Sequence, residues 1–249
     1  MKTLNVGKFV IRLMEKTPIE IKRVQAFRYQ YLLRDYNPHL PTEGIDDDGY
    51  DAYSESLLVI DTENDQIVGT YRLATPLTIK DQKFLTEKEF DLTPLKRNGT
   101  HFVELGRAVV HPDYRNGFVI QLLFLGLYHY ATENGCEYMI GMGSFHGVDP
   151  TIYPHAFAML LKMYQCPDFT IAAVENAFEF DFVSSDQIDY QLAKEQIPGL
   201  LRMYLTLGAS VSHNGFIDYE FKSCDVLIIL KVSEINVRYL ERIMRIKVS

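Results

Sequence analysis

Glu104 and Arg107 stand three residues apart in FVELGRAVV, a segment that begins at Phe102 and is otherwise apolar or small. Burial beside Val103 and Leu105 would desolvate the Glu104 carboxylate and make it a better base near neutral pH. Structural ion pairs perturb the ionisation of buried carboxylates in the same way. The segment therefore predicts either a general base at Glu104 or a buried ion pair.

The strand pattern decides whether the two charges can act together. Side chains alternate between the two faces of a strand, so Glu104 and Arg107 would point to opposite faces. A bulge at Leu105 or Gly106 would bring them together, and Gly106 permits one. Without a bulge, we expect the two side chains to serve different neighbours.

A turn, HPDYRNG, follows this strand and opens an apolar helix. The unpaired backbone N–H groups at the start of a helix attract anions. Arg115 adds a positive charge to the turn, Asn116 follows it, and Gly117 lets the backbone approach a phosphate. The alternative is an ordinary connection with a solvated arginine. The turn is thus a candidate site for the phosphate of a cofactor or donor.

Arg28, Arg72 and Arg107 are cations set among apolar residues, and each must find an anion. The loop 37–51 contains four aspartates, two prolines and two glycines. Its length and composition make it a functional candidate. The three arginines and this loop are therefore candidate parts of a functional site.

Metal binding is not expected. Tyr50 and Leu57 occupy positions at which a calcium loop that starts at Asp46 needs ligands. The histidines show no ligand spacing. The three cysteines lack the paired spacing of a zinc site and fit reduced thiols.

Hydrophobic periodicity predicts an α/β fold in which helices flank a mixed sheet. No linker or repeat is visible, so we expect one domain, 1–249, with a core at about 9–165 and a C-terminal completion at 166–249. The predicted strands are 9–15, 56–62, 67–75, 102–109, 138–145 and 226–232. The predicted helices are 17–35, 118–134, 150–165, 197–208 and 234–247, with an irregular acidic stretch at 166–195.

Composition narrows the functional classes. The net charge is −8 and the pI is near 5.4, which argues against general binding of nucleic acid. The first residues do not resemble a secretion signal, and the most apolar helix is too short to cross a bilayer. We expect a cytoplasmic protein, and the basic, apolar final helix suggests peripheral contact with the inner membrane face.

Four motifs together resemble a known family. In order they are GTYRL, VELGRAVVHPDYRNG, YMIGMGSFHG and IPGLLRMYLTLGA. The second and third resemble the core of the GCN5-related N-acetyltransferase (GNAT) fold, in which two central strands splay apart. The whole set is similar to the ornithine N-acyltransferase and N-acyl amino acid synthase family, which is related to the acyl-homoserine lactone synthases.

The resemblance implies transfer of a long-chain, often 3-hydroxylated, fatty acyl group from a thioester to the α-amine of an amino acid such as ornithine or glycine. Glu104 would be the base, and a backbone N–H near Val109, after Arg107, would stabilise the oxyanion. In the lactone synthases, arginines at the positions resembled by Arg28, Arg72 and Arg107 form a network with two loop carboxylates, which Asp48 and Asp51 resemble. Such a network could order the loop over the acceptor or be a purely structural lattice. The further implied site residues are Ser144 and Phe145 along the acyl donor, and Arg115, Asn116 and Gly117 at the donor phosphate.

The donor is expected to be an acyl carrier protein carrying phosphopantetheine, or else acyl-CoA, with no permanently bound cofactor. Val119 stands where relatives that use acetyl-CoA usually have a second small residue, which favours the carrier protein. An acyl-homoserine lactone synthase, an acetyl-CoA-dependent N-acetyltransferase and a non-catalytic acyl-binding sensor are the alternatives.

Overall fold

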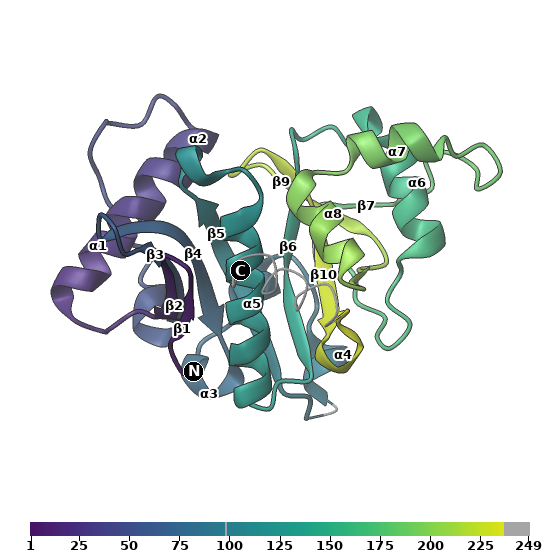
Figure 1. The fold of residues 1–249 in the computed structure, drawn as a ribbon. Helices are drawn as coiled ribbons and strands as arrows, with labels where there is room; N and C mark the ends of the chain where they lie inside the picture. Colours follow the sequence, from purple (N-terminus) through teal and green to yellow (C-terminus); the bar gives the residue numbers. More distant parts are fainter. Residues whose placement is uncertain (98, 237–249) are drawn as a thin grey trace. The chain divides into compact units, whose positions relative to one another are not determined.

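The fold was analysed in a computed structural model, which describes residues 1–97 and 99–236. These residues form two compact units (Figure 1). The first unit comprises residues 1–82, 103–136 and 236, and the second comprises 83–97, 99–102 and 137–235. Each unit is described below by itself.

The first unit is built on an antiparallel sheet in which consecutive strands are neighbours. Its strands are β1 (Leu4–Val6), β2 (Phe9–Leu13), β3 (Glu55–Asp61), β4 (Gln66–Ala74) and β5 (Phe102–Val110). Its longer helices are α1 (Pro18–Arg28) and α5 (Phe118–Glu133), and α3 (Pro76–Ile79) is short.

The start of α1 follows from its sequence. Thr17 caps the helix by accepting a hydrogen bond from the Glu20 N–H at 3.2 Å, and Pro18 occupies the first turn. The helix then continues as a π-helical segment, η1 (Tyr29–Leu33), and ends in α2 (Arg34–Tyr36). The predicted helix over 17–35 is therefore confirmed, with a π-helical turn that its periodicity does not reveal.

The two long helices, α1 and α5, pack against side chains from opposite faces of the same strands. Leu58 of β3 packs with Phe27 of α1 in one apolar cluster. On α5, a Cβ added at Gly126 would lie 2.8 Å from side-chain atoms of Ile11 and Leu57. Because Leu57 and Leu58 are adjacent in β3, α1 and α5 cover opposite faces of the sheet (Figure 1).

The second unit contains a second antiparallel arrangement, in the order β6, β10, β9, β7, with β8 paired to β10. Its strands are β6 (Tyr138–His146), β7 (Ala177–Phe178), β8 (Ser210–Val211), β9 (Gly215–Asp218) and β10 (Ser223–Lys231). Its helices are α4 (Thr93–Arg97), α6 (Pro154–Met163), α7 (Tyr190–Gln196) and α8 (Gly199–Thr206).

Aromatic packing fixes one face of this second sheet. Phe157 of α6 lies 4.6 Å from Phe145 of β6 and 4.8 Å from Phe178 of β7, measured between ring centroids. Leu201 of α8 packs against Gly143 of β6. The face of β6 and β10 that carries Phe145 therefore supports α6 and α8, and the side chains of the alternate residues point to the other face.

Short 3-10 turns complete the chain: η2 (Tyr50–Tyr53), η3 (Leu85–Lys88), η4 (Pro112–Tyr114), η5 (Pro150–Ile152) and η6 (Val232–Glu234). The stretch 166–195 is not wholly irregular, because Asp189 caps α7 by accepting from the N–H groups of Gln191 and Leu192. The predicted final helix and its membrane contact lie almost wholly outside the described residues. Among the helices that are described, none has the length and apolarity needed to span a membrane.

Candidate active site

A bulge in β5 brings Arg107 to the loop aspartates. Thr70 of β4 pairs with Val109, and Arg72 pairs with Gly106, so Arg107 and Ala108 together oppose the single residue between them in β4. Arg107 has φ of 51°, a left-handed conformation that is uncommon for a residue with a side chain. The bulge therefore begins one residue after Gly106, later than the two positions at which the sequence suggested that one could form.

Arg28 lies at the buried end of a network of three arginines and three aspartates. Its two terminal nitrogens each lie 2.7 Å from an oxygen of Asp51, which is a bidentate pair. Its Nε lies 2.8 Å from Asp46 Oδ2, and its Nη2 donates to the Asp46 carbonyl. Gln25 adds a donor to Asp51 at 2.9 Å. Helix α1 thereby anchors both ends of the acidic part of the loop.

Arg72 and Arg107 form the outer part of the same network. Arg72 Nη1 donates to both oxygens of Asp48 at 2.7 and 2.8 Å. Arg107 bridges two aspartates, with Nε 3.0 Å from Asp46 Oδ2 and Nη2 2.9 Å from Asp48 Oδ2. Exposure of the side chains rises from 1% at Arg28 to 18% at Arg107 and 23% at Asp48. We call these six residues the arginine–aspartate network.

The arginine–aspartate network lowers the pKa values of Asp48 and Asp51. Burial would raise the pKa of Asp48, but Arg72 and Arg107 outweigh it and hold this pKa below its usual value. Burial likewise opposes ionisation of Asp51, and Arg28 more than compensates, which lowers the pKa of Asp51. Asp48 and Asp51 are thus held in the ionised state by guanidinium groups.

Glu104 lies on the network's face of the sheet. It pairs with Ala74 in β4, two residues from Arg72, so Glu104 and Arg72 point to the same side. Glu104 is 6% exposed. Val109 belongs to the apolar cluster under α1 and so faces the same side. Arg72 Nη2 is buried and makes no hydrogen bond to any described residue. This face therefore combines a buried carboxylate with an unsatisfied guanidinium donor.

The turn before α5 holds the residues that the sequence predicts to bind the donor phosphate. Gly117 is the N-cap residue of α5, has φ of 89° and has no side chain with which to cap the helix. Asn116 Oδ1 accepts from the Phe118 N–H at 3.0 Å. Arg115 is not a freely solvated cation, because it donates to Asp35 at 2.6 Å and to the Val110 carbonyl at 2.9 Å. The turn is thus preorganised, with the guanidinium held beside it.

Ser144 and Phe145 belong to the second unit. Phe145 is fully buried in the aromatic cluster with Phe157 and Tyr153. Ser144 is half-buried and lies directly opposite Asp225 in the pairing of β6 with β10. The two predicted contacts therefore point to opposite faces of β6.

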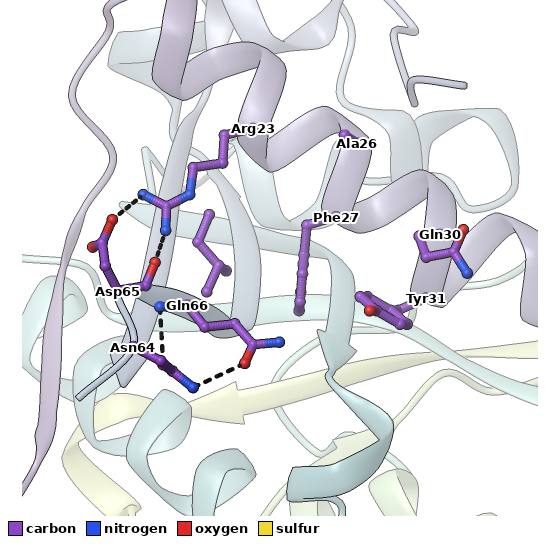
Figure 2. Close-up of a pocket in the computed structure, with 9 residues that line it drawn as sticks. Arg23, Ala26, Phe27, Gln30, Tyr31, Asn64, Asp65 and Gln66 are labelled. Carbon is purple, nitrogen blue, oxygen red and sulfur yellow. Dashed lines mark hydrogen bonds and ion pairs between the residues drawn. The ribbon is translucent and has the colours of Figure 1, made fainter. Parts of the chain in front are cut away.

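A surface pocket of about 460 Å³ lies between α1 and the turn that joins β3 to β4 (Figure 2). Phe27 and Tyr31 line it on one side, and Asn64 and Gln66 on the other. Its charged residues, Arg23 and Asp65, already pair with each other. None of the predicted site residues lines this pocket.

Sequence reasoning missed a carboxylate cluster in the second unit. Single oxygens of Glu89, Asp218 and Asp225 all lie within 4.8 Å of one another. A signal was present, because Asp225 is the only acidic residue in the strand SCDVLIILK. The other two carboxylates come from distant segments, and no spacing rule connects them.

Comparisons with known proteins agree with this description. A family model described as "Acetyltransferase (GNAT) domain" matches residues 27–125. The L-ornithine N(alpha)-acyltransferase of Agrobacterium fabrum is 34% identical over 237 residues, which cover 89% of this chain and 80% of that protein. The enzyme of the same name from Brucella abortus is 31% identical, covering 94% and 88%.

Two solved structures share the fold at low sequence identity. An N-acyl amino acid synthase from uncultured soil microbes has a TM-score of 0.51 at 12% identity, covering 93% of this chain and 97% of that one. A CoA-dependent acyl-homoserine lactone synthase has a TM-score of 0.52 at 14% identity, covering 96% and 97%. The predicted fold class and family are confirmed. The chain belongs to the L-ornithine N(alpha)-acyltransferase family, and it is an acyltransferase of the GNAT fold.

Proposed function

We propose that residues 1–249 form one catalytic domain that transfers a long-chain fatty acyl group, with or without a 3-hydroxyl group, from a thioester to the α-amine of ornithine or a related amino acid. The observation that carries this proposal is the arrangement of Glu104 and Arg72 on one face of the first sheet. The names of the relatives supply the acceptor.

Glu104 is the proposed base. It takes a proton from the α-ammonium, directly or through water, and the nitrogen then attacks the thioester carbonyl. The backbone N–H of Val109 donates to the oxyanion of the tetrahedral intermediate. Collapse of the intermediate breaks the carbon–sulfur bond. The thiolate takes up a second proton from the nitrogen, so the products are an amide, a thiol and one released proton.

The proposed contacts of the acceptor carboxylate are the outer arginines. Arg72 Nη2 is a buried donor that lacks a partner among the described residues, and a donor in that state costs free energy until it is satisfied. Arg107 is the more exposed of the two guanidinium groups that share Asp48. Arg28, Asp48 and Asp51 would hold these groups in place.

For the donor, we propose an acyl carrier protein whose phosphodiester binds at Arg115, Asn116 and Gly117. Ser144 and Phe145 are retained as predicted contacts of the donor. Val119 does not help to choose between this donor and acyl-CoA. Its side chain is buried, and a Cβ added at Gly69 would lie 2.8 Å from Val119 Cγ1, so Val119 points into the sheet and not toward the turn.

Mass spectrometry tests the proposal directly. The purified protein is mixed with 3-hydroxyacyl carrier protein or with acyl-CoA, and with a panel of amino acids. We expect N-acylornithine or a related N-acyl amino acid. An acyl-homoserine lactone, an N-acetylated product, or acyl binding without turnover would each reject this function in favour of one alternative.

A further inference from the structure

A buried hydroxyl group on β4 has no partner in the described part of the chain. Thr70 is 1% exposed, and its Oγ1 makes no hydrogen bond to any described residue. Its neighbours on the two adjoining strands are Leu58 of β3 and Val109 of β5, which both belong to the apolar cluster under α1. A buried hydroxyl without a hydrogen bond costs free energy. A structural role alone therefore does not account for Thr70.

Thr70 points to the same face of the first sheet as the proposed catalytic groups. A Cβ added at Gly69, the preceding residue, would lie 2.8 Å from the side chain of Val119 in α5, so residue 69 faces α5 and Thr70 faces α1. Arg72 follows two residues later in β4 and points to the same side as Thr70, as does Glu104. All of these residues lie within the first unit.

The two unsatisfied donors of β4 flank the position opposite the bulge of β5. Thr70 pairs with Val109 just after the bulge, and Arg72, whose Nη2 is likewise unsatisfied, pairs with Gly106 just before it. Residues directly opposite one another in an antiparallel pair have Cβ atoms about 4.5–5.5 Å apart. The Thr70 hydroxyl therefore lies near Val109, which is the proposed position of the thioester carbonyl.

We propose that Thr70 is a further catalytic residue, whose hydroxyl donates a hydrogen bond to the oxyanion that forms from the thioester carbonyl. This inference rests on the proposed function and extends it by a second oxyanion donor beside the N–H of Val109. The Thr70 hydroxyl keeps its proton throughout, so the bonds formed and broken and the fate of each proton stay as described above. Because the negative charge develops as the amine attacks, this hydrogen bond is stronger in the transition state than in the ground state.

The surroundings of Thr70 favour this role over a contact with the acceptor. Leu58 and Val109 make them apolar, and a hydrogen bond to a developing charge is stronger in apolar surroundings than in water. The acceptor carboxylate already has two proposed contacts, Arg72 and Arg107. The oxyanion has only one, although oxyanion holes are typically built from more than one donor.

Thr70→Val and Thr70→Ser test the hydroxyl and the methyl group separately. Valine has the shape of threonine without the hydroxyl, and we expect kcat to fall about 10²–10³-fold, the loss typical of one oxyanion donor. KM for the amino acid and for the acyl donor should stay near the wild-type values, because the lost contact belongs to the transition state. Thr70→Ser keeps the hydroxyl and should retain most of the wild-type kcat.

The matched control is Thr62→Val, a second removal of a threonine hydroxyl in the first unit. Thr62 is exposed, and its hydroxyl donates to the Lys8 carbonyl at 2.9 Å. Thr62→Val should therefore leave kcat unchanged. A fall in kcat that occurs in Thr70→Val and not in Thr62→Val belongs to the position and not to the type of substitution.

Unfolding in urea supplies a readout that a structural role would move in the opposite direction. Replacement of an unsatisfied buried hydroxyl by a methyl group should leave the urea midpoint of Thr70→Val at or above that of the wild-type protein. Thr70→Ser loses a buried methyl group and should have a lower midpoint. We therefore expect Thr70→Val to be the more stable and the less active of the two variants.

A Thr70→Val protein with wild-type kcat would overturn the inference, because the hydroxyl would then touch no reacting atom. A rise in KM for the amino acid at unchanged kcat would do the same and would place Thr70 at the acceptor. A lower urea midpoint for Thr70→Val than for Thr70→Ser, or failure of Thr70→Val to fold, would show that the hydroxyl has a structural role and would also reject the inference.

The inference and the proposed function fail in distinguishable ways. If the wild-type protein acylates an amino acid and Thr70→Val does so at the same rate, the role of Thr70 is wrong and the function stands. If the wild-type protein acylates no amino acid with either donor, the proposed function is wrong and the inference falls with it.

Discussion

At the scale of residues, buried charged side chains occur in two groups that differ in their balance of positive and negative charge. The arginine–aspartate network balances three cations with three anions. The cluster of Glu89, Asp218 and Asp225 contains three acids, and Asp225 has no cationic partner among the described residues. A balanced network mainly supports geometry, whereas a buried carboxylate without a cation, such as Asp225, lowers the stability of the folded protein. Substitutions in the two places should therefore have opposite effects on stability.

Glu104→Gln tests the base while the shape of the side chain is kept. Loss of general-base catalysis typically costs about 10²–10⁴-fold in rate, and we expect a fall of that size in kcat. The far-ultraviolet circular dichroism spectrum should stay that of the wild-type protein. Glu175→Gln, an exposed glutamate, is the control and should retain full activity. A Glu104→Gln protein with wild-type kcat would remove Glu104 from the mechanism.

Arg28→Met tests the balanced network. The change leaves Asp46 and Asp51 buried without the cation that contacts both, and breaking a buried pair costs about 3–5 kcal/mol. We expect the free energy of unfolding, measured with urea, to fall by that amount. Arg23→Met removes a partly exposed pair with Asp65 and should cost about 0–1 kcal/mol. Equal losses in the two variants would contradict a structural role for Arg28.

Asp225→Asn should make the protein more stable at pH 8. Because the folded pKa of Asp225, about 6, lies above that of an unfolded aspartate, the folded state holds the proton more tightly. The contribution of Asp225 to stability is therefore present at low pH and is lost as the pH rises from about 4 to about 6. A shift of this size corresponds to about 2–3 kcal/mol.

The measurement is the difference in unfolding free energy between Asp225→Asn and the wild-type protein, taken from urea titrations between pH 4 and pH 8. It should favour the variant at pH 8 and shrink toward pH 4. A difference that is independent of pH would show that Asp225 does not titrate in this range.

At the scale of elements, the hydrophobic periodicity of the sequence made most strands and helices of the first unit predictable. The hairpin of β3 and β4, the strand β5 and the helix α5 lie within a few residues of their predicted bounds. Each of these combines a clear periodicity with an evident stop signal. A bulge was one of two alternatives for β5, and it lies at Arg107 and Ala108 and not at Leu105 or Gly106. The helix α7 was missed, since seven residues give little periodicity.

The site was predictable to the extent that charges stood out from apolar surroundings. Arg28, Arg72 and Arg107 were recognised in that way, and they do meet the loop aspartates. The carboxylate cluster was not predictable. Glu89 follows a short 3-10 turn and Asp218 ends a four-residue strand, so only the tertiary fold brings them to Asp225.

Gly126→Ala tests the packing of α5 on the sheet. A Cβ at this position would lie 2.8 Å from side chains of Ile11 and Leu57, so the helix or the strands must move. Overpacking of this kind costs about 1–3 kcal/mol, and we expect that loss in urea unfolding. Gly199→Ala is the control, because its Cβ would meet nothing closer than 3.7 Å. Equal stability of Gly126→Ala and the wild-type protein would show that α5 and the sheet leave room for a methyl group at this position.

At the scale of the whole molecule, the net charge of −8 opposes binding of an acidic donor protein. Acyl carrier proteins are strongly acidic, so two anionic proteins must meet through a local basic surface. Lys22 is exposed on α1 and forms no ion pair with the described residues. Lys22 is therefore a candidate for contact with the acidic surface of a carrier protein. Acyl-CoA has no such protein surface, so its binding should not depend on Lys22.

Lys22→Glu should accordingly separate the two donors. Reversal of a charge at the rim of an interface mainly slows association, and we expect KM for the acyl carrier protein to rise about three- to tenfold. KM for acyl-CoA should stay unchanged. Added salt should reduce the difference in KM for the carrier protein between Lys22→Glu and the wild-type protein, because salt screens exposed charges. Lys2→Glu makes the same change in net charge at another exposed lysine and serves as the control. Equal effects of the two substitutions would mean that net charge alone opposes the carrier protein, and that Lys22 does not contact it.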